Sequence, residues 1–169
     1  MQVCFIGHRK ITQTDALISL LRETVAQLIK QGANTFLFGS MSQFDDLSWK
    51  IVTELKRTYP HIKRVYVRAA FKNIDKTYED YLLNSYEETY YPKTLSKAGK
   101  FSYVERNYEM IDKSTHCIFY FDKNYTPTTQ SNEKIISVPM RNSGTKIAYE
   151  YAVRRHKIIY NLFDILAQF

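Results

Sequence analysis

Short apolar runs alternate with longer amphipathic stretches along the chain. Val3 to Ile6, Thr35 to Phe38 and Ile62 to Ala69 are rich in apolar and β-branched residues, which predicts buried strands. The stretches between them repeat apolar residues at helical spacing, from Leu17 to the stop at Gly32 and from Phe44 to Tyr59. This alternation of strand and helix is typical of a parallel sheet with right-handed crossovers.

The start of each of these two helices is predicted by a capping box. Thr12 and Asp15 have the required spacing before the first helix, and Ser42 and Asp45 have it before the second. In such a box the hydroxyl accepts a hydrogen bond from a backbone N–H of the first turn. The two helices are therefore expected to begin just after Thr12 and Ser42.

The second half of the chain continues the pattern less regularly. Residues 70–114 separate two strands by more than one crossover helix, and we expect helices there at about 75–90 and 103–113. Further strands are expected at 117–121, 135–138 and 158–160. A polar loop joins the first two of these, which could form a hairpin, and a last helix is expected to begin near 143. We therefore expect a single α/β domain over residues 1–169, with a Rossmann-like parallel or mixed-edge sheet, helices on both faces and a tyrosine-rich helical insertion at about 70–114.

Composition changes this picture little. A hydrophobic fraction of 44% and a mean hydropathy of −0.39 are typical of a globular chain. No apolar run reaches transmembrane length, and no leader is seen before the first strand. We therefore expect a cytoplasmic location and no membrane partner. Cys4 and Cys117 lie in apolar runs without a nearby His or Cys, which favours core residues over a disulfide or zinc. We expect no metal and no resident cofactor.

The net charge of +7 would help to attract anions, but the basic residues are scattered among acids. A phosphate-bearing ligand is weakly favoured, and nucleic acid stays possible. The basic run from Arg154 to Lys157 resembles a nucleic-acid patch, yet it ends a predicted helix, where cations complement the helix dipole. We prefer the helix-end interpretation.

Polar clusters follow two predicted strands and precede the last helix, the places where open α/β sheets collect ligands. After the first strand come Gly7, His8 and Arg9, in which Gly permits close approach and Arg offers a forked donor for phosphate or carboxylate. A simple glycine turn with two solvated side chains explains them equally well. After the second strand come residues 39–46, and here the cap formed by Ser42 and Asp45 is favoured over a ribose-binding or catalytic role.

The cluster that opens the last helix is the best candidate for an anion site. Asn142, Ser143, Gly144 and Thr145 supply backbone N–H groups, hydroxyls and an unobstructed glycine, and Lys146 follows. No acid lies in this first turn, unlike in the first two helices. A mere N-cap at Asn142 or Ser143 is the alternative, and we prefer the phosphate site.

Two further features have a plain structural alternative. Arg106 and Asn107 lie in a predicted helix with Met110 and Ile111 on its apolar face, and a solvated helix surface is the default for both polar residues. The tyrosines at 78, 81, 86, 90 and 91 could stack on a base, but at near-helical spacing they are more often packing residues. We keep stacking as the minority interpretation.

Taken together, short motifs in order from Val3 to about Asn161 resemble the SLOG superfamily and, more narrowly, its YpsA-like branch. These motifs are Cys4 to Arg9, Phe36 to Gly39, Gln43 to Asp45, Glu105 to Asn107, and Asn142 to Thr145 with Ala148. The resemblance implies a Rossmann-like fold related to the nucleotide phosphoribohydrolases, the molybdenum-cofactor carriers and DprA. It also implies a pocket for nucleotides or NAD-derived molecules.

The resemblance assigns roles motif by motif. Gly7, His8 and Arg9 would line the pocket. The residues expected to face the sugar are Gly39, Ser40, Gln43 and Asp45, those expected to hold phosphate are Ser143, Gly144 and Thr145, and those expected to close one side are Arg106 and Asn107. In the phosphoribohydrolases a catalytic Glu follows three residues after the loop Thr, where this chain has Ala148. Glu150 is rotated from it by roughly 200 degrees on a helix, so the resemblance supports binding better than hydrolysis.

Three functions remain. The first is a module that senses or sequesters a nucleotide or an ADP-ribose-type ligand. The second is an enzyme that cleaves the N-glycosidic bond of such a ligand, with Asp45 as the best remaining carboxylate. The third and least favoured is binding of single-stranded nucleic acid. Self-association into a homo-oligomer is compatible with all three.

Overall fold

The computed structural model describes residues 1–39, 42–96, 99–125 and 143–168. Their strands form one six-stranded sheet in the order β4-β3-β2-β1-β5-β6, with every neighbouring pair parallel. The strands are β1 (Gln2–Gly7), β2 (Thr35–Phe38), β3 (Lys63–Val67), β4 (Glu88–Tyr90), β5 (His116–Tyr120) and β6 (Ile158–Asn161). The helices are α1 (Asp15–Lys30), α2 (Gln43–Lys56), α3 (Lys76–Leu83), α4 (Lys100–Lys113), α5 (Gly144–Arg154) and α6 (Leu162–Leu166). The expected α/β fold with a Rossmann-like parallel sheet is confirmed.

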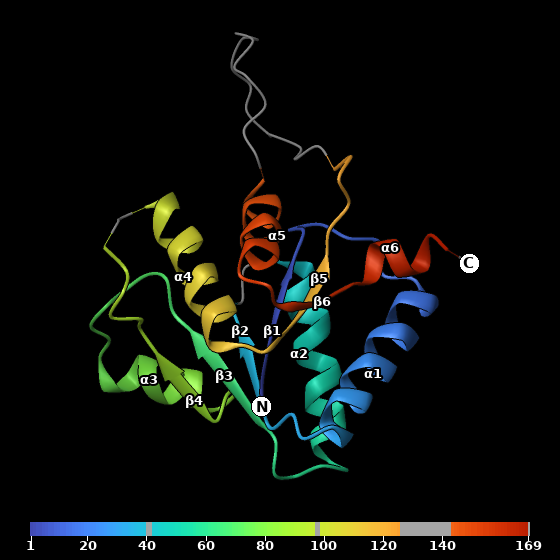
Figure 1. Ribbon diagram of the computed structural model, residues 1–169. Coiled ribbons are helices and arrows are strands. Elements are labelled where there is room, and N and C mark those ends of the chain that lie inside the picture. Colours follow the sequence, from blue (N-terminus) through green and yellow to red (C-terminus); the bar gives the residue numbers. More distant parts are fainter. Residues whose placement is uncertain (40–41, 97–98, 126–142, 169) are drawn as a thin grey trace, which may run out of the picture.

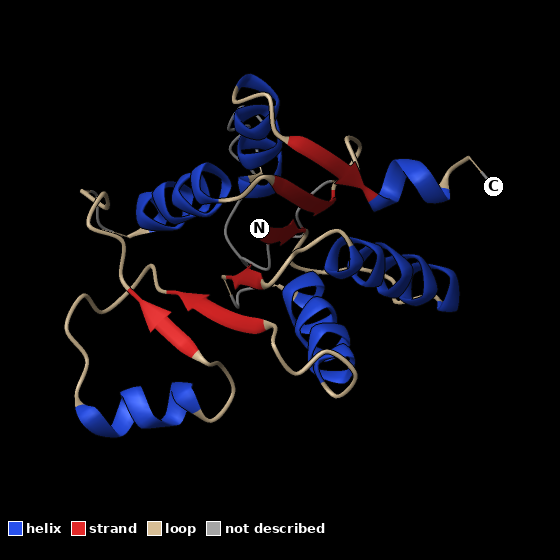
Figure 2. Ribbon diagram, turned by 60° about the horizontal axis from the view of Figure 1, so that its bottom comes forward, coloured by secondary structure: helices blue, strands red, loops and turns tan. Residues whose placement is uncertain are grey.

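Helices cover both faces of the sheet (Figures 1 and 2). Helices α1, α2 and α6 pack on one face, where Phe5, Phe36 and Phe38 form the centre of a buried cluster. Helices α4 and α5 pack on the other face, against a second cluster that includes Cys4 and Cys117. Because β1 and β5 are covered on both faces, their sequences are continuous apolar runs without alternation.

Both cysteines are free and buried, as expected for core residues. Cys4 and Cys117 are partners in the register of β1 and β5. Burial is the main cause that raises the pKa of the Cys4 thiol well above its usual value, and the neighbouring Cys117 acts in the same direction. The thiol is therefore protonated and behaves as a core side chain.

The helix starts agree with the capping predictions in one case and differ in the other. Ser42 is the N-cap of α2, and its hydroxyl accepts a hydrogen bond from the backbone N–H of Asp45. The N-cap of α1 is Thr14 and not Thr12: the Thr14 hydroxyl accepts from Leu17 N, and Asp15 is the first residue of the helix. The spacing to an acid selected Thr12, but the hydroxyl that caps the helix belongs to the threonine two residues later.

The insertion contains a strand that the sequence pattern did not predict. The helix expected at 75–90 ends at Leu83, and Glu88–Tyr90 forms β4, which pairs with β3 at the edge of the sheet. The helix expected at 103–113 begins three residues earlier, at Lys100. The strand expected at 135–138 lies outside the described residues. Helix α6 was not expected from the sequence, since it spans only five residues.

The strand order places a topological switch point between β1 and β5. From β1 the chain moves through β2, β3 and β4 to one edge of the sheet, and it then returns to the other side of β1 with β5 and β6. In open α/β sheets, ligands bind in the crevice at the carboxyl ends of the strands beside such a point. The segments after β1, β2 and β5 and the start of α5 are therefore the first place to examine.

Candidate functional site

The loops that follow β1 and β2 lie side by side. The backbone N–H of Gln43 donates to the carbonyl of Arg9 at 3.0 Å, and the Gln43 amide oxygen accepts from the backbone N–H of Ile11 at 2.9 Å. Gly7 lies against Phe44 so closely that an added Cβ would be about 2.5 Å from the ring. A glycine is thus required at the end of β1, and the first two polar clusters meet at one edge of the sheet.

His8 is buried at the switch point, where it pairs with the backbone of Asp122. It is 2% exposed, and its Nε2 accepts a hydrogen bond from the backbone N–H of Asp122 at 2.9 Å. Burial lowers the pKa of His8, with the Asp122 contacts acting in the opposite direction. Nε2 also lies 3.2 Å from the carbonyl oxygen of Asp122, so it pairs with the Asp122 backbone in either neutral tautomer. The other ring nitrogen, Nδ1, is buried and has no hydrogen-bond partner within the part of the chain that the structure describes.

The aromatic ring of Tyr125 stacks on His8, with the two ring centroids 3.9 Å apart. Asn161, at the end of β6, holds the neighbouring backbone: its amide donates to the carbonyl of Phe121 and accepts from the N–H of the same residue. The sequence did not single out Phe121, Tyr125 or Asn161 as site residues. The only available signal was an Asn at the end of a short apolar strand.

Arg106 is a buried structural cation, and the solvated-surface interpretation is wrong for it. Its side chain is 4% exposed, and Nη1 donates to the carbonyls of Gly39 at 2.6 Å and Val67 at 3.2 Å. Its Nε donates to the Asn107 side chain at 3.0 Å. Burial lowers the pKa of the guanidinium, and the charge of Asp45 opposes that shift. Arg106 thus ties α4 to the ends of β2 and β3.

Asp45 combines its capping position with a buried contact to the β2 loop. It is 7% exposed, and its two carboxylate oxygens accept from the Ser42 hydroxyl at 3.1 Å and from the Gly39 N–H at 3.4 Å. A Cβ at Gly39 would collide with the Arg106 guanidinium, so this loop requires glycine. Asp45 and Arg106 therefore both bind the backbone of Gly39. Ser40 lies outside the described residues.

The start of α5 holds the third polar cluster. Ser143 is the N-cap, and its hydroxyl accepts from the backbone N–H of Lys146 at 3.1 Å. A Cβ built on Gly144 would meet no described atom within 4 Å, and the first turn contains no acid. Thr145 is buried. Helix α4 also starts without an acid, so that property alone does not select α5. Asn142 lies outside the described residues.

A chain of aromatic contacts connects α5 with His8. Phe121 lies 5.9 Å from the His8 ring and 4.8 Å from the Tyr149 ring, measured between centroids. Tyr149 is about one helical turn beyond Thr145. The buried Nδ1 of His8 and the first turn of α5 therefore lie in the same neighbourhood at the switch point.

Ala148, where the resemblance described above led us to look for a catalytic Glu, is part of the core. Ala148 is 1% exposed and packs with Cys4 and Ile6 of β1. The carboxylate of Glu150 lies 3.9 Å from the ammonium group of Lys146, on the exposed side of the helix. Neither residue brings a carboxylate to the end of β1.

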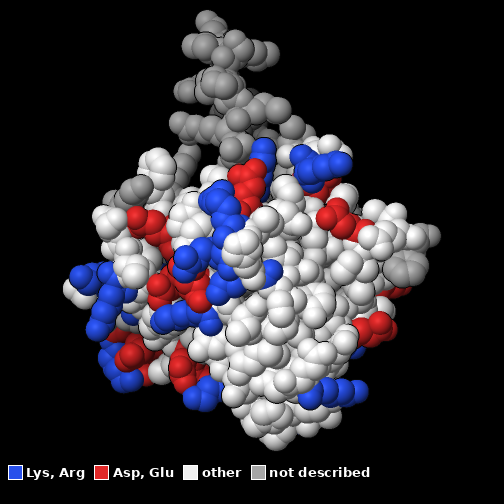
Figure 3. All heavy atoms as spheres, in the orientation of Figure 1, with Lys and Arg blue, Asp and Glu red and all other residues white. Residues whose placement is uncertain are grey.

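The surface shows mixed charge. On the face in Figure 3, Lys and Arg side chains are interspersed with Asp and Glu. The basic run does end a helix, since α5 stops at Arg154 and Arg155 is its C-cap. Arg155 Nε donates to the Asp112 carboxylate, and Lys157 Nζ donates to the carbonyls of Asp112 and Ser114. Within residues 1–39, 42–96, 99–125 and 143–168, no helix is long and apolar enough to cross a membrane, and no group of three potential metal ligands occurs.

These features define a doubly wound, Rossmann-like α/β protein with polar side chains gathered at the carboxyl ends of its central strands. The sequence model of the YpsA family, described as the YspA SLOG family, matches residues 5–151, and the chain belongs to this family. No curated protein sequence matches. A solved structure similar to this one is DNA processing protein A from Helicobacter pylori, studied for its single-stranded DNA binding mode. The TM-score is 0.57 at 15% identity, with 99% of this chain and 72% of that chain covered.

Proposed function

We propose that this protein binds a nucleotide or a nucleotide-derived ligand of the ADP-ribose type at the carboxyl ends of β1, β2 and β5. The observation that carries the proposal is the buried Nδ1 of His8 at the switch point, which has no hydrogen-bond partner among the described residues. A buried polar atom without a partner costs about 1–3 kcal/mol, and a polar group of a ligand would satisfy it.

The other groups of the crevice suit the same ligand. The first turn of α5 offers backbone N–H groups of Gly144 and Thr145 to a phosphate, and the helix dipole favours an anion there. Arg9, in the loop after β1, is exposed and offers a cationic side chain to the same ligand. Gly39 and Asp45, held in place by Arg106, form the side of the crevice proposed to face the sugar.

The proposal is binding with little or no turnover. Hydrolysis of an N-glycosidic bond needs a carboxylate at the reacting carbon. Ala148 does not supply one, and Asp45 already accepts hydrogen bonds from Ser42 and Gly39. A sensor or sequestering module fits this arrangement better than a hydrolase.

The test is calorimetric titration of the purified protein with ADP-ribose, AMP and NAD, together with thermal shifts that report ligand linkage. Thr145→Glu places a carboxylate at the phosphate position and should abolish binding. Thr58→Glu is the matched control, because Thr58 is exposed beyond the end of α2, before β3. Unchanged affinity in a folded Thr145→Glu variant would refute the phosphate site.

A second candidate is binding of single-stranded DNA, which the likeness to DNA processing protein A favours. In that case a fluorescent oligonucleotide would bind with a strong salt dependence while the mononucleotides do not bind. A third outcome would identify a hydrolase: release of free base by the wild type, detected by chromatography and lost in a folded Asp45→Asn variant.

A further inference from the structure

A cleft lined by aromatic side chains lies between α2, β3 and α3. Its volume is about 560 Å³, within the range of small-molecule sites. Among the groups that line it are Asp45, Asp46, Trp49, Lys50, Tyr66, Tyr78, Tyr81 and Tyr86. Asp45 belongs both to this cleft and to the Gly39 loop, so the cleft adjoins the crevice proposed above.

The packing role expected for the tyrosines holds for Tyr86, which belongs to the core on the α1 and α2 face of the sheet, but not for the two tyrosines on α3. Tyr78 and Tyr81 are 38% and 68% exposed on α3, with parallel rings whose centroids are 6.2 Å apart. Tyr66 and Tyr86 stack deeper in the cleft at 5.3 Å. Tyr90, by contrast, packs in the cluster on the other face of the sheet. The exposed pair on α3 is thus available to a ligand.

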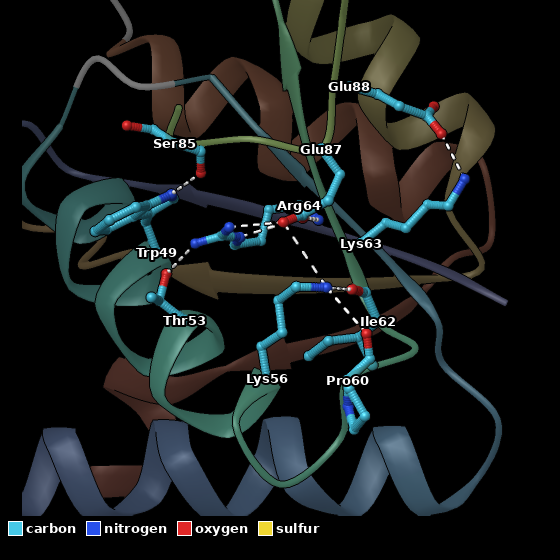
Figure 4. A network of polar contacts seen from close by, with 10 residues as sticks. All are labelled: Trp49, Thr53, Lys56, Pro60, Ile62, Lys63, Arg64, Ser85, Glu87 and Glu88. Atoms are coloured by element: carbon cyan, nitrogen blue, oxygen red, sulfur yellow. Dashed lines mark hydrogen bonds and ion pairs between the residues drawn. The ribbon is translucent and has the colours of Figure 1, made fainter. Parts of the chain in front are cut away.

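Trp49 lines this cleft. Figure 4 shows the polar contacts that hold its indole. Its indole N–H donates to the carbonyl of Ser85 at 3.0 Å, and the guanidinium of Arg64 lies 5.5 Å from its ring centroid. Glu87 binds Arg64 through both carboxylate oxygens, and the Thr53 hydroxyl accepts a further hydrogen bond from Arg64. A stacking surface fixed in this way loses little entropy on binding.

The polar groups at the cleft select among planar ligands. Asp46 and Lys50 are exposed and form no ion pair within the described part of the chain. Asp46 can accept from an exocyclic amino group. An organic cation is disfavoured, because Arg64 already lies over Trp49 and Lys50 lines the cleft.

We infer that this cleft receives an amino-bearing nucleobase such as adenine, an inference that rests on the proposed function. The stacking surfaces are the rings of Tyr78, Tyr81 and Trp49, and Asp46 accepts a hydrogen bond from the amino group. Asp45 lies between the base and the proposed position of the sugar. The base belongs either to a small nucleotide or to a single strand of nucleic acid.

Trp49 is the only tryptophan of the chain, so its emission reports on the cleft directly. Adenosine, which has no phosphate, should quench or shift this emission saturably, and uridine should do so more weakly. Tyr81→Ala should weaken adenosine binding roughly tenfold, by loss of one stacking contact. Tyr81→Phe should retain binding, since it keeps the ring.

Leu83→Ala is the matched control, because Leu83 lies on the same helix with 41% exposure and does not line the cleft. It should titrate like the wild type. An unchanged emission at millimolar adenosine, equal affinity for uridine, or a wild-type affinity in Tyr81→Ala would overturn the inference. A much tighter response to oligo(dA) than to adenosine would support it and identify a strand as the source of the base.

The two proposals fail separately. ADP-ribose binding that depends on Thr145 but not on Tyr81, with no response to adenosine, would remove the base cleft and leave the proposed function standing. Adenosine binding that depends on Tyr81, combined with ADP-ribose binding that is indifferent to Thr145→Glu, would support the cleft and remove the phosphate site.

Discussion

Replacement of Arg106 by Met tests whether one buried cation holds the crevice together. Met roughly preserves the volume of the side chain but removes the donors to the carbonyls of Gly39 and Val67. It also leaves the carboxylate of Asp45 buried without the nearby guanidinium. Both effects lower the stability of the folded state and leave the unfolded chain nearly unchanged.

The expected loss follows from the kind of contact removed. Hydrogen bonds to a charged group contribute about 1.5–3 kcal/mol each, and breaking a buried charge network by removing one partner costs about 3–5 kcal/mol. The free energy of unfolding should therefore fall by about 3–5 kcal/mol. For a domain of this size the melting temperature should fall by roughly 6–20 °C.

Urea denaturation followed by circular dichroism measures this loss. Arg106→Lys should recover only part of it, because an ammonium cannot reproduce the forked geometry. Asp45→Asn should reduce the cost of Arg106→Met by about 1–3 kcal/mol in a double-mutant cycle. A loss below about 1 kcal/mol, or a cost that is independent of Asp45, would refute the reasoning.

Other positions give further predictions. Burial lowers the pKa of His8 below its usual 6.5, so below that pH the unfolded chain binds more protons than the folded chain. From pH 7 to 5.5 the free energy of unfolding of the wild type should therefore fall by up to about 1.4 kcal/mol per pH unit more than that of His8→Gln. Equal losses in the two proteins would contradict a neutral, buried ring. In urea denaturation Gly7→Ala should cost about 1–3 kcal/mol, because its Cβ would meet Phe44. Gly144→Ala, in open space, should be neutral or stabilising by up to about 1 kcal/mol, and equal effects at the two glycines would refute the close approach at Gly7. Ala148→Glu should cost about 3 kcal/mol or more by burying a carboxylate, without creating hydrolase activity in the chromatographic assay; a stable, active variant would contradict this.

The central strands could be predicted from the sequence because burial on both faces leaves a simple signature. β1 and β2 are continuous apolar runs, and β2 has the predicted boundaries. β4 has only three residues, each at least partly exposed, so it carries no comparable pattern. The tyrosine spacing was instead interpreted as one helix that runs past Leu83, where α3 ends.

The parts of the candidate site that consist of local sequence motifs could be predicted. The parts that join residues far apart in the sequence could not. The clusters after β1 and β2 and before α5 lie at the expected strand and helix ends. The burial of Arg106 had a signal that was given too little weight: Arg106 precedes Met110 by four residues and therefore shares its buried face. The pairing of His8 with Asp122 joins positions 114 residues apart, which no local pattern shows.

The central place of β1 has a consequence for how the chain folds. β1 pairs with β2, about thirty residues away, and also with β5, which begins at His116. An emerging chain can form the half-sheet of β1 to β4 early, but one edge of β1 stays unpaired until β5 has been synthesised. Contacts of such sequence separation form slowly, and an exposed edge during that interval invites association with other chains. The half-sheet intermediate is where we expect misfolding of this protein to begin.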